Sequence, residues 1–519
     1  MRHRGSTIAV FALLASVILA ACGGNTGGAA ATAVPAEATS APAAATAAPA
    51  ATAMTEPTAM MESTAMVEPT AMAEPTAMAE PTAEAMTSGE SSLGALEANA
   101  ANVSQELADA FAGKYKGTVV TMDGPFVDAD ANKFNDSVKE FEEKTGIDIQ
   151  YAGSKQFEAA ISARVDGGNA PDIADFPQPG LAASFASAGK VVDVSTFIKP
   201  EWLAQNYIQS YLDIATLAGP DGDVVAGVWH RGFPKSLVWY PKAAFDEANY
   251  EVPETWEELT ALMDQIVADG DTPWCIGIES EAATGWAATD WTEEMMLRTT
   301  SLENYDKWVT GELPFTDPVV KNAVTEWSNI WFDDKYVYGG RASIVTTSFG
   351  NAPKPMFDKP DPKCYLHKQG SFITSFFPEG VQAGTDYSVF YLPPLDPQYG
   401  KPVLFSGDLM VMFNDRPEVR AVQSFFSSAA SVESWVKAGG ALPLQKDASL
   451  DWYSNDVDKS VAEVLANAES VRFDASDLMP GVVGAGTFWK GMTDYVAGTA
   501  DLDTAMEEVQ AGWANAPKQ

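Results

Sequence analysis

Residues 132–151 read NKFNDSVKEFEEKTGIDIQY and join a helix pattern to a strand pattern. Phe134, Val138 and Phe141 recur at the spacing of one helical face, which predicts an amphipathic helix. Gly146 follows, and glycine is a common residue at the point where a helix ends. The five residues after it alternate apolar and polar side chains, as a half-buried strand does. The segment therefore predicts a helix that leads directly into a strand.

Strand and helix patterns continue on both sides of this segment. Expected strands cover 118–122 and 171–176, and expected helices cover 157–165 and 181–188. Alternation at these lengths predicts βαβ units, and hence an α/β fold with a parallel sheet covered on both faces. Ligands of such sheets bind beyond the carboxyl ends of the strands. Here those ends carry residues 123–126, 153–156 and 176–178.

Composition excludes several classes of function. The 519 residues contain 32 Lys and Arg against 71 Asp and Glu, a net charge of −39. Nucleic acid binding requires clustered positive charge, so we expect no nucleic acid partner. Three histidines are too few for a His-based metal site, and no metal is expected. The Gly-rich stretches lack the P-loop and dinucleotide-binding spacings, so we expect no cofactor.

The first 21 residues resemble a bacterial lipoprotein signal peptide. Two arginines precede an apolar run, which is shorter than a membrane-spanning helix and ends in Leu19-Ala20-Ala21-Cys22. This ending resembles the lipobox, in which the cysteine is lipidated and becomes the new N-terminus. The alternative is a plain secretory peptide in which Cys22 is incidental.

Residues 22–92 are expected to form a disordered stalk. They consist mainly of Ala, Thr, Pro, Glu and Met, and a hexapeptide that begins Ala53-Met54-Thr55-Glu56-Pro57 recurs within them. A proline in nearly every copy prevents a continuous helix. Without aromatic residues the segment buries too little surface to offset chain entropy. The stalk would hold a folded domain away from the outer face of the cytoplasmic membrane.

Two further cysteines lie in the part of the chain that follows the stalk. Cys275 and Cys364 are the only pair once Cys22 is lipidated, and an extracytoplasmic location permits disulfides. We expect the two to be bridged. The alternative is two buried free thiols.

Three motifs stand in a characteristic order: residues 134–151, GNAPDIADFPQPG at 168–180, and LVWYPKAAFDEANYEVPETWEEL at 237–259. Together they resemble the extracellular solute-binding proteins of ABC importers, and most closely the branch that binds maltose and α-glucosides. The resemblance covers roughly residues 115–515.

The resemblance implies a periplasmic-binding-protein-like fold, with two α/β lobes joined by a hinge of several strands. Lobe one would comprise residues 100–240 and 390–435. Lobe two would comprise residues 241–389 and 436–519. The ligand would lie between the lobes, and ABC permease subunits would receive it from a monomeric protein that is not an enzyme.

Sugars present apolar C–H faces edged by hydroxyls, so a sugar site combines aromatic rings with polar side chains. By resemblance, Trp489 would stack on a sugar ring, and Phe176 and Gln178 would occupy pocket positions. The chain has Phe176 where maltose binders have Trp, and no Asp-Arg pair follows. Residue types add further ligand-binding candidates: Trp229, Trp286, Arg231, Lys235, Asp290, Asn351 and Asp408.

Two other functions remain open at this stage. The same fold could bind another solute, such as a polyamine or an amino acid. A lipid-anchored glycoside hydrolase would need two carboxylates about 5–10 Å apart, and 71 acidic residues leave such pairs possible.

Overall fold

The computed structural model describes residues 91–516, which belong to one compact unit. The expected signal peptide, Cys22 and nearly all of the expected stalk lie outside these residues. Within them, no helix is both long and apolar enough to cross a membrane.

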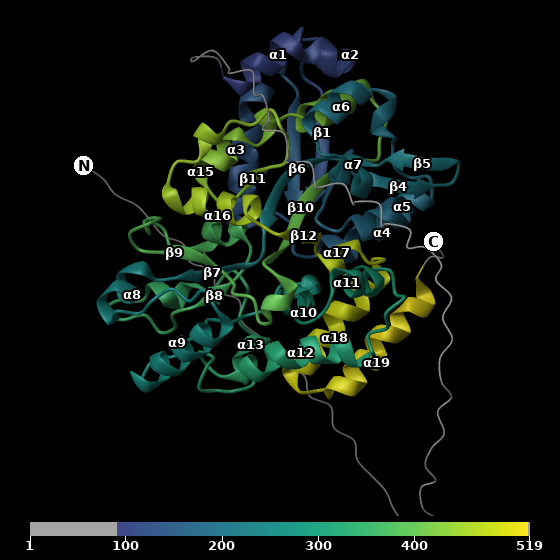
Figure 1. The fold of residues 1–519 in the computed structure, drawn as a ribbon. Coiled ribbons are helices and arrows are strands. Elements are labelled where there is room, and N and C mark those ends of the chain that lie inside the picture. The colour runs from purple at the N-terminus through teal and green to yellow at the C-terminus, as the bar shows by residue number, and fades with distance from the viewer. Residues whose placement is uncertain (1–90, 517–519) are drawn as a thin grey trace, which may run out of the picture. The chain divides into compact units, whose positions relative to one another are not determined.

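Lobe one is built around a mixed β-sheet (Figure 1). Its chain begins at Ser92, earlier than the expected residue 100, because Leu93, Leu96 and Ala100 bury one face of the first helix in the core of this lobe. Its elements up to the first crossing are α1 (Ser92–Val103), α2 (Gln105–Phe111), β1 (Val119–Gly124), α3 (Asp128–Thr145), β2 (Asp148–Gly153), α4 (Phe157–Asp166), β3 (Ile173–Phe176), α5 (Pro179–Ser187), α6 (Pro200–Asn206), α7 (Gln209–Ala215), β4 (Thr216–Gly219), β5 (Gly222–Val225) and β6 (Gly227–Pro234). Later in the chain the lobe adds β10 (Pro402–Met412), α14 (Pro417–Phe426), α15 (Glu433–Ala438), β11 (Leu442–Pro443) and β12 (Ser470–Phe473).

Strand order in this sheet is β11-β6-β10-β3-β1-β2, with β12 also paired to β10. The expected parallel pairing is confirmed for β1 with β2 and with β3. It is wrong for β10, which runs antiparallel to β3 and β6. The reason is the path of the chain: β6 leaves the sheet for lobe two and β10 returns from it at the same end, so the two strands run in opposite directions.

Lobe two contains the small antiparallel sheet β8-β7-β9 and a group of helices. Its elements are β7 (Leu237–Tyr240), α8 (Lys242–Ala248), α9 (Trp256–Ala268), α10 (Trp286–Thr299), α11 (Leu302–Val309), α12 (Pro318–Trp331), α13 (Arg341–Ile344), β8 (His367–Lys368), β9 (Ser388–Tyr391), α17 (Ala475–Leu478), α18 (Trp489–Ala497) and α19 (Leu502–Gly512). Helix α10 packs between α12 and strand β10 (Figure 1). The Gly-rich stretch before α18 is a π-helical turn, Val482–Phe488, rather than an open loop.

Three separate groups of buried apolar side chains define the lobes. One lies in lobe one, one in lobe two, and a third beside the small sheet. The third group also receives Val457 and Val461 of α16 (Asp456–Ala466), which packs against β9.

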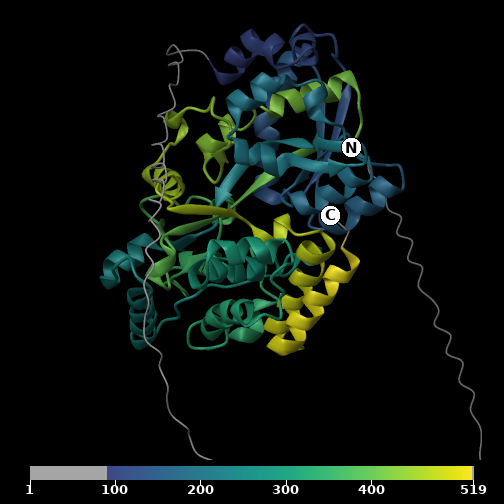
Figure 2. The same ribbon diagram turned by 45° about the vertical axis from the view of Figure 1, so that its right-hand side comes forward.

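The last expected boundary between the lobes is wrong. Trp435, Val436 and Trp452 are buried in the core of lobe one, and β11 pairs with β6 in the sheet of that lobe. Between β11 and β12, α16 packs against β9 of lobe two, and after β12 the chain enters lobe two at Ala475 with α17 and remains there. Figure 2 shows the C-terminal helices, in yellow, beside the other helices of lobe two.

Three short crossings connect strands of the lobe-one sheet directly to elements of lobe two. Lys235 and Ser236 connect β6 to β7, residues 392–401 connect β9 to β10, and Asp474 connects β12 to α17. The first two crossings lie within a few residues of the expected positions. Cys275 and Cys364, which form a disulfide, both lie in lobe two.

Candidate functional site

A pocket lies between the two lobes, with about 820 Å³ of space, part of which is open to solvent. Its wall takes residues from both lobes and from the crossings between them. The loops after β1, β2 and β3 contribute Phe126, Lys155 and Gln178, as the position of the strand ends predicts.

Arg231 of β6 is the charged centre of the lobe-one wall. Its Nε donates to Oδ2 of Asp408, and its Nη2 lies 3.3 Å from Oδ2 of Asp130. The guanidinium also lies 3.9 Å from the ring centroid of Trp435 and 4.5 Å from that of Phe126. These contacts hold the side chain in one orientation, and the third nitrogen, Nη1, has no partner among the described residues.

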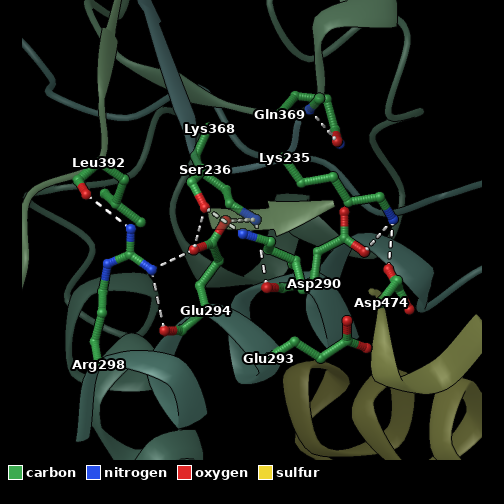
Figure 3. Close-up of polar contacts among 12 residues, drawn as sticks. Lys235, Ser236, Asp290, Glu293, Glu294, Arg298, Lys368, Gln369, Leu392 and Asp474 are labelled. Carbon is green, nitrogen blue, oxygen red and sulfur yellow. Dashed lines mark hydrogen bonds and ion pairs between the residues drawn. The ribbon is translucent and has the colours of Figure 1, made fainter. Parts of the chain in front are cut away.

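Lys235, at the first crossing, is a second charged centre of the pocket wall. Its Nζ lies 2.9 Å from Oδ1 of Asp290 and 2.6 Å from Oδ2 of Asp474 (Figure 3). Burial alone would lower the pKa of Lys235, but the two carboxylates hold it well above its ordinary value. Burial raises the pKa of Asp290 to about 7 in spite of the neighbouring ammonium.

Asp290, Glu293 and Asp474 also stand close enough together to share a metal ion. Lys235 already bonds two of them, and Glu293 accepts the backbone N–H groups of Ala475 and Ser476. The cluster thus contains its own cation, and the structure gives no reason to place a second one there.

Several buried polar atoms on the pocket wall have no hydrogen-bond partner among residues 91–516. They are the acceptors Oδ1 of Asp130, Oε2 of Glu158, Oε1 of Gln178 and Oδ2 of Asp290, and the donors Nη1 of Arg231 and Nε1 of Trp489. Because buried polar groups are nearly always paired, such a concentration at one pocket indicates a ligand that supplies the missing partners. Burial also raises the pKa of Glu158 to about 7.

Aromatic rings form the apolar part of the wall. Trp286 packs against Phe349 and Phe372, with ring centroids 5.1 and 5.9 Å apart, and Trp489 lies at the start of α18. Phe126 and Phe376 complete this surface. The pocket therefore combines flat apolar faces with unpaired polar atoms.

Seven of the residues singled out in the sequence line this pocket: Gln178, Arg231, Lys235, Trp286, Asp290, Asp408 and Trp489. Three others do not. Trp229 is buried in lobe one, where its Nε1 donates to the carbonyl of Tyr211. Phe176 is buried among Phe157, Phe185 and Phe413.

The third residue, Asn351, is exposed and accepts a hydrogen bond from Lys354. It lies in a neighbouring hollow that shares Lys155, Phe349 and Phe376 with the pocket. Trp229 and Phe176 fail as pocket residues because alternate residues of a buried strand face the core, and sequence alone did not show which set does so.

Sequence reasoning missed Asp130, Glu158 and Asp474. Asp130 and Glu158 lie in the first turns of α3 and α4, the helices that follow β1 and β2, and Asp474 directly follows β12. Their position shortly after predicted strands could have indicated a place in the pocket, but this signal is weak in a chain with 71 acidic residues.

Comparison with known proteins decides the family. The family model for bacterial extracellular solute-binding proteins matches residues 128–434. The chain belongs to this family. It is 43% identical to the alpha-glucosides-binding periplasmic protein AglE of Rhizobium meliloti, over 77% of this chain and 87% of that protein. It is 42% identical to the osmoprotective compounds-binding protein GgtB of Synechocystis, over 76% and 92% of the two chains.

Solved structures agree on the fold of this solute-binding protein. The bacterial solute receptor AcbH superimposes with a TM-score of 0.65 at 18% identity, over 77% of this chain and 99% of the other. A chitin oligosaccharide binding protein gives a TM-score of 0.64 at 18% identity, over 77% and 98% of the two chains. The expectation of a two-lobed periplasmic-binding-protein-like fold is confirmed.

Proposed function

We propose that this protein captures a neutral sugar, an α-glucoside or short oligosaccharide, between its lobes and delivers it to an ABC permease. The unpaired polar atoms of the pocket carry the proposal. A sugar hydroxyl both donates and accepts a hydrogen bond, so a few hydroxyls would satisfy the four acceptors and two donors together. The aromatic rings of Trp286 and Trp489 would cover the apolar C–H faces.

Charge favours a neutral ligand over an ionic one. An anionic sugar would meet unpaired oxygens of Asp130, Glu158 and Asp290. A polyamine would need carboxylates without a cation, but two of these three, Asp130 and Asp290, already pair with Arg231 and Lys235. The names of the two relatives, which refer to α-glucosides and to osmoprotective compounds, also support a sugar of this class.

Calorimetry on the full chain tests the proposal. Trehalose, maltose and sucrose are titrated in parallel with spermidine and glutamate. At least one neutral glucoside should bind, with a rise in melting temperature that increases with ligand concentration. Binding of spermidine or glutamate without binding of any sugar would overturn the choice of ligand.

The same preparation tests whether the protein acts by binding alone. Incubation with maltose, trehalose and nitrophenyl glucosides should release no glucose or nitrophenol. Release that survives purification to constant specific activity would favour the hydrolase.

Anchoring is a separate part of the proposal. Cys22 would carry lipid and hold a monomeric protein on the outer face of the cytoplasmic membrane, with the stalk as a spacer. The Leu-Ala-Ala-Cys ending and the Pro-rich repeat support this. The wild-type chain should fractionate with membranes and Cys22→Ser should not. Retention of processed Cys22→Ser on membranes would contradict the anchor.

A further inference from the structure

Helix α10 contacts the pocket with its first turns and all three crossings with its later turns. All of its side chains from Ala287 to Arg298 are buried. Among them are four charged residues, Asp290, Glu293, Glu294 and Arg298, and each bonds a crossing or the residues next to one. Figure 3 shows the bonds of Asp290, Glu294 and Arg298.

The first crossing is held through two adjacent residues. Lys235 bonds Asp290, and Oγ of Ser236 donates to Oε2 of Glu294 at 2.9 Å. The same hydroxyl accepts the backbone N–H of Leu404 in β10 at 2.8 Å. One serine therefore joins α10, the first crossing and the returning strand.

The second crossing is held by Arg298. Its Nη2 donates to the carbonyl of Leu392 at 2.8 Å, and its Nε donates to the carbonyl of Pro393 at 3.1 Å. Its Nη1 bonds Glu294, which fixes the guanidinium in place. Both side chains are fully buried, so the pair is shielded from solvent.

Glu293 holds the chain immediately after the third crossing. Its two carboxylate oxygens accept the backbone N–H groups of Ala475 and Ser476 at 3.0 and 3.1 Å. Asp474, immediately before them, bonds Lys235 of the first crossing. All three of these crossings are thus bonded, directly or through the residues next to them, to one helix.

We propose that α10 couples the ligand pocket to the hinge, with Glu294 and Arg298 as positioning residues that set the angle between the lobes. Trp286 and Asp290 at the start of the helix would contact the ligand, and the rigid helix would carry any shift to the crossings. Glu294 and Arg298 do not line the pocket, so they would act only through the hinge. The ligand half of this inference rests on the proposed sugar-binding function.

The angle between the lobes can be measured without any ligand. Lys139 of α3 and Gln265 of α9 are exposed and lie in different lobes, so cysteines there accept spin labels. The full chain carries Cys22→Ser, and Cys275 and Cys364 are bridged. Pulsed electron spectroscopy then gives the distribution of distances between the labels.

Glu294→Gln and Arg298→Lys should each shift or broaden this distribution relative to the wild type. Thr292→Val is the matched control: Thr292 lies on the same buried helix, but its hydroxyl bonds Trp327, Ala288 and Met492 within lobe two. The control should leave the distribution unchanged. If Glu294→Gln fails to fold, Ser236→Ala takes its place. This change removes the bond between α10 and the first crossing with a smaller loss of stability.

Affinity for the bound glucoside provides the second measurement. If the binding-competent arrangement falls about tenfold in population, the apparent Kd rises about tenfold. Folded variants whose distances match the wild type would overturn the proposal, even if they bind more weakly, because the residues would then act on the pocket itself. If the wild type binds no sugar, the proposed ligand is wrong, whereas the ligand-free distances still decide the role of α10.

Discussion

Lys235 and Asp290 are paired through only one of the two carboxylate oxygens. Nζ of Lys235 lies 2.9 Å from Oδ1 of Asp290, whereas Oδ2 is buried without a partner among the described residues. The ammonium thus fixes the carboxylate and leaves the second oxygen of this pocket-lining residue without a partner. An oxygen held in this way is a preorganised acceptor for a ligand hydroxyl.

Replacement of that carboxylate should weaken sugar binding. Asp290→Asn keeps the shape of the side chain but removes a charge-assisted hydrogen bond, which is worth about 1.5–3 kcal/mol. We expect the Kd for the glucoside to rise by about 10- to 150-fold in calorimetry. Asp264→Asn, on the exposed face of α9, is the control and should bind as the wild type does. Equal affinity of Asp290→Asn and wild type would remove Asp290 from the site.

The two tryptophans Trp489 and Trp229 should respond in opposite ways. Trp489 lines the pocket, so Trp489→Ala should weaken binding by about 1–3 kcal/mol, the scale of one buried aromatic face. Trp229 lies in the core of lobe one, so Trp229→Ala should cost about 3–5 kcal/mol of stability. Calorimetry and denaturant unfolding on both variants separate the effects. A Trp229→Ala protein with normal stability and lost binding would reverse the assignment.

Sequence periodicity predicted the local structure around α3 well. Phe134, Val138 and Phe141 are buried together, and Gly146 ends the helix with φ of 73°. It could not predict the antiparallel placement of β10, because strand order depends on contacts between residues hundreds of positions apart. The third crossing at Asp474 was missed for the same reason: the segment before it returns to the sheet of lobe one through β11.

The pocket was partly predictable because it lies where α/β sheets bind ligands. Gln178 follows β3 directly, and residue types alone selected Arg231 and Asp290. Trp229 and Phe176 show the limit of that reasoning. An aromatic residue suits a sugar and a core equally well, and only the direction of its side chain decides between them.

The disulfide between Cys275 and Cys364 leads to a third prediction. It joins residues 89 positions apart within lobe two. A cross-link that closes a loop of this length lowers the entropy of the denatured state and so raises the free energy of unfolding by about 2–5 kcal/mol. Thiol labelling of the unfolded, unreduced Cys22→Ser chain should detect no free thiol, and reduction should lower the unfolding midpoint. Two reactive thiols before reduction would show that the cysteines are not bridged.

The raised pKa of Glu158 makes stability depend on pH. Burial raises the pKa of this carboxyl from 4.5 to about 7 in the folded protein. Below pH 4.5 the group is protonated in both the folded and unfolded states and contributes nothing. Between pH 4.5 and about 7 the unfolded chain releases a proton that the folded chain keeps, so the free energy of unfolding falls as pH rises. Above about pH 7 the free energy of unfolding has fallen by its full amount.

Glu158→Gln should therefore stabilise the ligand-free protein at pH 8, by at most about 3 kcal/mol, and have little effect at pH 4. The amide cannot ionise, so it removes the cost of a buried charge. Thermal unfolding at both pH values measures the difference, and Glu140→Gln, on the exposed face of α3, should show no such dependence. The same Glu158→Gln change should weaken binding of the glucoside at pH 8, because the unpaired Oε2 then no longer offers a charged acceptor. Equal stabilisation at pH 4 and pH 8 would show that the carboxyl does not titrate near neutrality.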